Sequence, residues 1–201
     1  MTGAAVFLLL QAAHQQHHPP RSASEYAKVL EDPQRDSWQK PHEVVTTLAL
    51  RPGEIVADIG AGSGYFTRRL ARHAAKVYAV DIDAELLGKA RTSSPANVTT
   101  ILATPDDPKL GAASVDTVFI CDVLHHIEVR PAYYAKLARA LKPGGRIVIV
   151  DFYKRPLPVG PPPAMKLTPE QVKEELAAAG FALVESHDFL PHQYFLEFKA
   201  R

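Results

Sequence analysis

Short β-branched runs alternate with longer segments of helical spacing along this 201-residue chain. The runs are Ile55 to Ile59, Val77 to Val80, Val98 to Leu102, Val115 to Ile120 and Arg146 to Phe152. Between them, apolar residues recur every three or four positions, which predicts helices after Gly64, over Ala84 to Arg91 and over Pro131 to Leu141. In the first of these helices, Phe66, Leu70 and His73 share one face. Strands alternating with helices predict an α/β fold with a parallel sheet covered on both faces.

The last part of the chain follows a different pattern. Thr168-Pro169-Glu170-Gln171 predicts a helix start, with Thr168 as the cap, Gln171 at the third helical position and Gly180 at the end of the helix. Two strands over Leu183 to Leu190 and Gln193 to Phe198 flank Pro191-His192. A connection this short predicts an antiparallel hairpin.

Before the first strand, two helices are predicted, over Ser22 to Leu30 and from Pro41 to Leu50. Residues 36–40 connect them and include Trp38. Residues 22–201 have the length of one α/β domain, of which about 22–50 form a helical N-terminal part.

Residues 1–21 lack packing periodicity. Ala4 to Leu10 is apolar, and Gln11 to Pro20 is rich in His, Gln and Pro. The apolar run is too short to span a membrane, and no Lys or Arg precedes it as in a secretory signal. We expect a disordered tail and a cytoplasmic protein, with an atypical signal segment as the alternative. A His-rich tail of this kind is more often a flexible segment than a metal site, so no metal is expected.

Composition limits the possible partners and compartments. A net charge of +1 gives no electrostatic reason to expect binding to nucleic acid or to an anionic membrane. Cys121 is the only cysteine, which excludes an intrachain disulfide framework and a cysteine-cluster zinc site. Hydrophobic residues make up 46% of the chain, enough for a substantial core.

A glycine-rich turn follows the first strand. Gly60, Gly62 and Gly64 stand at alternate positions after Asp58, and a second strand ends in Asp81 about 20 residues later. The turn leads into a helix, so backbone N–H groups and the positive helix end lie at the carboxyl edge of the sheet. An acid at the position of Asp81 can accept hydrogen bonds from both hydroxyls of a ribose.

The motifs VADIGAGSGYFT, YAVDID and LKPGGRIVIVDF, with the C-terminal strand pair, resemble the class I S-adenosylmethionine (SAM) dependent methyltransferases. The resemblance extends from about Trp38 to the end, and is closest to the small-molecule branch of ubiquinone and menaquinone biosynthesis. It implies SAM as cofactor and a doubly wound, Rossmann-like sheet of seven strands in the order 3-2-1-4-5-7-6, the last one antiparallel. In this family the N-terminal segment often closes over the cofactor, so Trp38 is either a lid residue or a packing residue between helix and sheet.

The resemblance also suggests which residues bind SAM. The expected set is Asp58, Gly60, Ala61, Gly62, Ser63, Asp81, Ile82, Thr104, Asp106 and Cys121. Asp81 is assigned to the ribose, and Asp106 to the adenine amino group with Thr104 beside it. The sequence Thr104-Pro105-Asp106-Asp107-Pro108 replaces the glycine-aspartate pair of many relatives, and such a turn is also explained without any ligand.

The implied reaction is in-line displacement at the sulfonium methyl. Most of its rate can come from holding the nucleophile and the methyl in near-attack geometry. His125, just after the fourth strand, is the candidate base or acceptor-orienting residue, and His126 is assigned to packing or solvent. Asp122, Tyr65 and Tyr26 are the alternative bases.

Missing motifs narrow the acceptor to a small organic molecule. The chain lacks the Asn/Asp-Pro-Pro-aromatic motif of amino-methylating DNA enzymes, and no proline precedes Cys121 as in cytosine C5 enzymes. Two other functions stay open at this point: a SAM-binding module without catalysis, and an NAD(P)-dependent oxidoreductase. The G-x-G-x-x-G spacing and the Tyr-x-x-x-Lys pair that would favour the oxidoreductase are absent.

Overall fold

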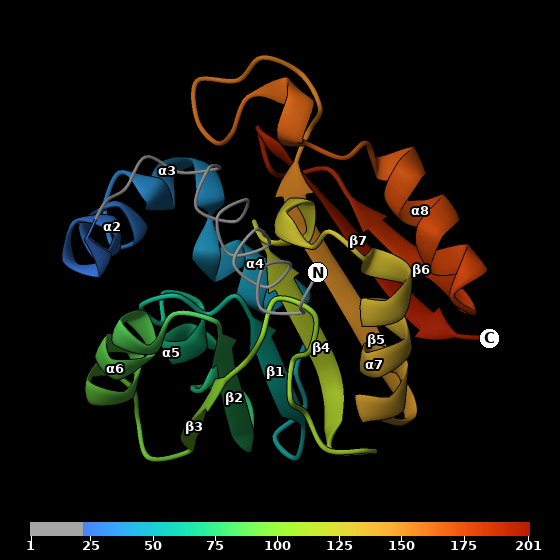
Figure 1. Ribbon diagram of the computed structural model, residues 1–201, viewed down its shortest axis with the longest axis horizontal. Coiled ribbons are helices and arrows are strands. Elements are labelled where there is room, and N and C mark those ends of the chain that lie inside the picture. Colours follow the sequence, from blue (N-terminus) through green and yellow to red (C-terminus); the bar gives the residue numbers. More distant parts are fainter. Residues whose placement is uncertain (1–21) are drawn as a thin grey trace, which may run out of the picture.

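The computed structural model describes residues 22–201, so the predictions for residues 1–21 lie outside the described part. A seven-stranded sheet in the order β3-β2-β1-β4-β5-β7-β6 forms the centre of the molecule (Figure 1). Its strands are β1 (Ile55–Ile59), β2 (Lys76–Asp81), β3 (Val98–Leu102), β4 (Val115–Cys121), β5 (Leu141–Phe152), β6 (Phe181–His187) and β7 (Gln193–Ala200). The predicted strand order is confirmed.

Strand direction follows from the connections. β1 to β5 pair in parallel, because each is linked to the next by a crossover segment. β7 pairs antiparallel with β5 on one side and with β6 on the other. The predicted C-terminal hairpin and the reversal of the last strand are therefore confirmed.

Helices cover both faces of the sheet. They are α2 (Ala23–Leu30), α3 (Arg35–Gln39), α4 (Pro41–Thr47), α5 (Thr67–Leu70), α6 (Ala84–Ser93), α7 (Arg130–Ala140) and α8 (Pro169–Ala178), with short 3-10 helices η1 (Leu124–His126) and η2 (Pro163–Met165). The apolar side chains of α4 and α5 pack with Phe119 and Val148 on one face. Those of α7 and α8 pack with Ile147 and Ile149 on the other. This is the doubly wound arrangement expected from the sequence.

The local signals at the start and end of α8 are confirmed. The Thr168 side chain accepts a hydrogen bond from the Gln171 backbone, and the Gln171 side chain accepts one from the Thr168 backbone. This reciprocal pair is the predicted capping box. Gly180 follows the helix with φ +88°, a left-handed conformation that glycine adopts at little cost.

Several element boundaries differ from the prediction. Residues 35–39 form the helix α3, where a plain connection was expected. This helix ends at Lys40, which precedes Pro41 and takes φ +44°, outside the right-handed helical region. α4 ends at Thr47, before the expected Leu50. α5 is a single turn, which leaves His73 exposed and buries Ala74 instead.

Within the described residues, no helix is both long enough and apolar enough to cross a bilayer.

Candidate cofactor and acceptor site

A cavity of about 670 Å³ lies at the carboxyl ends of the central strands. The glycine turn after β1 and the ends of β2 and β4 form its floor, and α2 and α3 close over it from the N-terminal part (Figure 1). Nine of the ten predicted cofactor residues line the wall: Asp58, Gly60, Ala61, Gly62, Ser63, Asp81, Ile82, Thr104 and Cys121. His125, Asp122, Tyr65, Tyr26 and Trp38 line it as well.

The glycine turn requires residues without side chains at two positions. Gly60 has φ +72°, and a Cβ there would overlap the side chain of Val123. Gly62 has φ +54°, and its Cβ would lie 2.8 Å from Leu30 Cδ1 in α2. The turn is therefore fixed by the segment after β4 on one side and covered by α2 on the other.

Asp81 fixes the glycine turn from the end of β2. Its Oδ2 accepts a hydrogen bond from the Gly62 backbone N–H at 2.7 Å, and its Oδ1 accepts one from Asp83 at 2.9 Å. Burial raises the pKa of the Asp81 carboxyl, and the backbone donors partly oppose this effect. A carboxylate has about four lone-pair positions, so Asp81 keeps acceptor capacity for a hydroxyl in the cavity.

Asp58 lies deeper, at the end of β1. Its Oδ2 accepts a hydrogen bond from Thr67 Oγ1 at 2.6 Å, which ties the strand to the start of α5. The side chain is buried, and this burial raises the pKa of Asp58 to about 7, with the Thr67 hydrogen bond acting in the opposite direction.

Asp106 does not line the cavity. Its side chain is 74% exposed, accepts a hydrogen bond from Thr104 Oγ1 at 2.8 Å and pairs with Lys136 at 3.4 Å. These contacts close the loop on itself, as a turn that needs no ligand would do. Of the two residues assigned to the adenine, the structure brings only Thr104 to the wall.

His125 and Asp151 form a buried pair at the opposite end of the cavity. His125 Nδ1 lies 2.8 Å from Asp151 Oδ1, and the two side chains are 2% and 1% exposed. Burial opposes a charged imidazole, but the Asp151 carboxylate outweighs it and raises the pKa of His125 above its usual value. Because Nδ1 faces the carboxylate, Nε2 is the ring nitrogen that can accept a proton.

Asp122 lies between the two ends of the cavity and has φ +59°, which is uncommon for a residue with a side chain. It accepts a hydrogen bond from Gln193 Nε2, and its Oδ2 lies 3.5 Å from Arg35 Nη2. Burial raises the pKa of Asp122 to about 7, although the Arg35 guanidinium acts against the shift. A group that titrates near neutral pH in a cavity is a typical functional residue.

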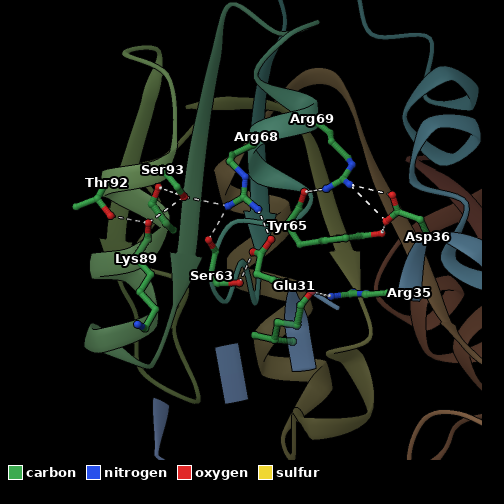
Figure 2. Close-up of polar contacts among 12 residues, drawn as sticks. Glu31, Arg35, Asp36, Ser63, Tyr65, Arg68, Arg69, Lys89, Thr92 and Ser93 are labelled. Atoms are coloured by element: carbon green, nitrogen blue, oxygen red, sulfur yellow. Dashed lines mark hydrogen bonds and ion pairs between the residues drawn. The ribbon is translucent and has the colours of Figure 1, made fainter. Parts of the chain in front are cut away.

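The N-terminal helices are fastened over the cavity by charged groups (Figure 2). Glu31, at the end of α2, accepts hydrogen bonds from Ser63 Oγ and from Arg68 Nη2, both at 2.6 Å. Asp36 in α3 accepts a hydrogen bond from the Tyr65 hydroxyl and pairs with Arg69 at 3.4 Å. These contacts join α2 and α3 to the glycine turn and to α5.

Aromatic rings and a proline-rich loop surround the end of the cavity near His125. Trp38 lies 5.7 Å from Phe152 between ring centroids. Gly160, with φ +83°, lies flat on the Phe152 ring, where a Cβ would come within 2.7 Å of it. Gly160, Pro161 and Pro162 all line the cavity. The indole lines the cavity and packs on Phe152 of β5, which supports the packing role of Trp38, and its role as a lid stays a prediction.

Sequence reasoning missed Asp151, Arg35 and Gln193. Asp151 stands in the motif LKPGGRIVIVDF, where an acid after four buried apolar residues signals the ligand edge of a parallel strand. No comparable signal marks Arg35 or Gln193, because their roles depend on tertiary packing.

Comparison with known proteins gives a consistent answer. Residues 57–149 match a methyltransferase domain family. A demethylmenaquinone methyltransferase of Tropheryma whipplei is 36% identical over 107 residues, which cover 52% of this chain and 44% of that protein. A second one, from Clavibacter sepedonicus, is 35% identical over 120 residues, covering 58% and 49%. The chain therefore matches about half the length of these curated relatives.

Solved structures share the fold over a longer stretch. A SAM-dependent methyltransferase of Aquifex aeolicus superposes with a TM-score of 0.81 at 24% identity, covering 89% of this chain and 98% of that one. A magnesium protoporphyrin IX methyltransferase of Synechocystis with bound S-adenosylhomocysteine (SAH) gives a TM-score of 0.66 at 22% identity, covering 86% and 87%. Residues 57–149 thus match a methyltransferase domain, and the chain shares its fold, including the sheet order, with SAM-dependent methyltransferases.

Proposed function

We propose that this protein transfers a methyl group from SAM to a small, flat organic acceptor that carries an acidic hydroxyl. The observation that carries the proposal is the buried His125–Asp151 pair at the end of the cavity near Trp38 and Phe152. A base and an enclosed space for an acceptor favour a catalytic module, because a module that only binds SAM needs neither.

The residues at the opposite end of the cavity, around the glycine turn, fit the cofactor. Along the backbone from Gly60 to Ser63, the glycines carry no side chain that would obstruct the cavity. Asp81 has acceptor positions for the ribose hydroxyls. Asp122 offers a carboxylate to the positive charges on the methionine part. When bound, SAM supplies a methyl group already activated by its sulfonium.

His125 then acts on the acceptor. Its Nε2 removes the hydroxyl proton as the acceptor attacks, and Asp151 stabilises the resulting imidazolium through Nδ1. The raised pKa of His125 makes it a stronger base than an isolated imidazole. Base catalysis of this kind contributes about 10²–10⁴-fold to the rate.

The end of the cavity near His125, Trp38 and Phe152, called the acceptor half, has walls that favour a flat molecule. Trp38 and Phe152 present aromatic faces, and the proline loop adds a rigid apolar side. The relatives named as demethylmenaquinone methyltransferases support an acceptor of this class. The same comparisons do not favour an NAD(P)-dependent oxidoreductase.

Two measurements test the proposal. Calorimetric titration should show binding of SAM and of SAH, and no competition from NAD(P)H. A screen with radiolabelled SAM should then show methyl transfer to naphthols and phenols, but not to their methyl ethers, which are matched controls without the acidic proton. Tight SAM binding without transfer to any hydroxylated acceptor would contradict a catalytic role.

A further inference from the structure

Three potential metal ligands meet on the edge of the sheet, away from the cavity. Glu185 and His187 stand two residues apart on β6 and therefore point to the same face. Glu197 on β7 is the direct cross-strand partner of Glu185. None of the three lines the cavity described above.

Their donor atoms have the spacing of a metal site. One atom from each side chain can be chosen so that all three lie within 4.8 Å of one another. His187 Nε2 and Glu197 Oε1 are 3.4 Å apart. Zinc bonds to nitrogen and oxygen are about 2.0–2.2 Å long, which places two ligands of a tetrahedral ion roughly 3.4 Å apart. The pair already has this separation.

The charges at this position are unbalanced. Like charges directly opposite each other on neighbouring strands destabilise a sheet, and Glu185 faces Glu197 in this way. Arg146 pairs with Glu197 Oε2 at 3.0 Å but is shared with Glu54 at 3.6 Å. Among the described residues Glu185 has no ion-pair partner. A cation between the two glutamates would remove this repulsion.

The surrounding structure holds the ligands in place. A register shift between Leu183 and Glu185 turns the Glu185 side chain to the face of Glu197. The Phe195 ring lies 4.8 Å from the His187 ring and limits its rotation. Arg146 binds one oxygen of Glu197, which is 5% exposed, and so leaves Oε1 directed at His187.

We propose that Glu185, His187 and Glu197 bind a divalent cation of the zinc class. One imidazole and two carboxylates are a suitable donor set for such an ion, and the exposed Glu185 leaves room for a water molecule as fourth ligand. The cation fastens the edge strand β6 to β7. It is a structural site, separate from methyl transfer.

Zinc binding to the full-length protein tests the proposal. His14, His17 and His18 are replaced by asparagine in every sample, because histidines of the N-terminal segment would add a competing site. In this background we expect one zinc ion per chain by competition with a chromophoric chelator. Zinc should also raise the thermal midpoint.

Single substitutions then locate the site. Glu185→Gln and His187→Gln should each weaken zinc binding at least tenfold. His73→Gln and Glu174→Gln, at exposed positions outside the cluster, should leave the affinity unchanged. Glu197 is not substituted, because the change would also break its ion pair with Arg146. Unfolding could then be mistaken for loss of the metal. A cooperative thermal transition without zinc shows that each variant is folded.

The outcomes separate clearly. Zinc affinity that stays the same in either Glu185→Gln or His187→Gln would overturn the three-ligand site.

Discussion

The two halves of the cavity are built in different ways. The half that we propose binds SAM, called the cofactor half, consists mainly of consecutive backbone, from Gly60 to Ser63, and of Asp81 about 20 residues later. The acceptor half is assembled from side chains on separate elements, Trp38 in α3, His125 in η1, Asp151 in β5 and the loop at Gly160. One half depends on local geometry and the other on tertiary packing.

This difference has a functional consequence. A site made of backbone and short turns serves one invariant ligand, since its shape does not depend on particular side chains. A site made of long side chains on separate elements can be altered by a few substitutions to accept other molecules. We therefore expect changes in the two halves to separate cofactor affinity from turnover.

The largest effect should come from removing the base in the acceptor half. His125→Asn keeps an amide that can donate to Asp151 but cannot take up a proton, whereas His125→Ala would leave the buried carboxylate unpaired. We expect turnover to fall about 10²–10⁴-fold with an unchanged dissociation constant for SAM. Single-turnover kinetics and calorimetry measure the two quantities. Near wild-type turnover would leave positioning alone as the catalytic device.

The pH profile gives a second view of the same pair. The base must be neutral, so turnover should rise with pH through the pKa of His125, which lies above its ordinary value. Asp151→Asn removes the charge that raises this pKa and should shift the rising limb to lower pH. An unshifted limb in this variant would show that a different group controls it.

Asp81 tests the cofactor half. Asp81→Ala removes a charge-assisted acceptor for two hydroxyls and should weaken SAM binding by roughly 1.5–3 kcal/mol, about 10- to 150-fold. Asp106→Ala is the matched control, because its exposed carboxylate lies outside the cavity wall and its loss should have little effect. Since Asp81 also accepts backbone bonds, Asp81→Asn and thermal melts check the fold. Equal effects of Asp81→Ala and Asp106→Ala would contradict the ribose assignment.

The same contrast explains what the sequence could predict. The capping box at Thr168 follows from a local pattern and the strand order from the family resemblance, and both are confirmed. The glycines and Asp81 have fixed spacing along the chain, and they line the cavity as expected, while their contact with SAM stays a prediction. Arg35 and Gln193 were missed because they reach Asp122 from distant elements. Asp106 carried the right chemistry, but its own turn directs the carboxylate outward.

The carboxylates between the two halves should make binding depend on pH. Burial raises the pKa values of Asp58 and Asp122 to about 7, so both are partly protonated in the free protein at neutral pH. A positively charged ligand favours the ionised forms, and SAM affinity should therefore fall as the pH drops below about 7, by up to tenfold per unit for one group. SAH lacks the sulfonium charge and should respond less. Asp122→Asn should flatten the dependence, and a profile unchanged by this substitution would exclude Asp122.

The free energy of unfolding should respond to the same two groups. Their pKa values are higher in the folded state than in the unfolded chain, so the folded protein binds more protons between about pH 4 and 7. The stability they contribute is present at the acidic end of this window and is lost as the pH rises to about 7. Denaturant titrations of the wild type and of Asp122→Asn at pH 5 and 7 measure this contribution. A greater loss of stability from pH 5 to pH 7 in the variant than in the wild type would reverse the assigned sign.

The smallest effect should come from the helices that cover both halves. Glu31→Gln removes the charge that holds α2 to Ser63 and Arg68, a partly exposed contact worth about 0.5–1 kcal/mol. We expect SAM to dissociate about two- to fivefold faster, because the cover opens more often while the floor of the cofactor half is unchanged. Glu43→Gln, on the exposed face of α4, is the control. Stopped-flow release measures both rates, and equal rates would mean that Glu31 does not fasten the cover in solution. High salt should reduce the difference, since screening already weakens an exposed ion pair.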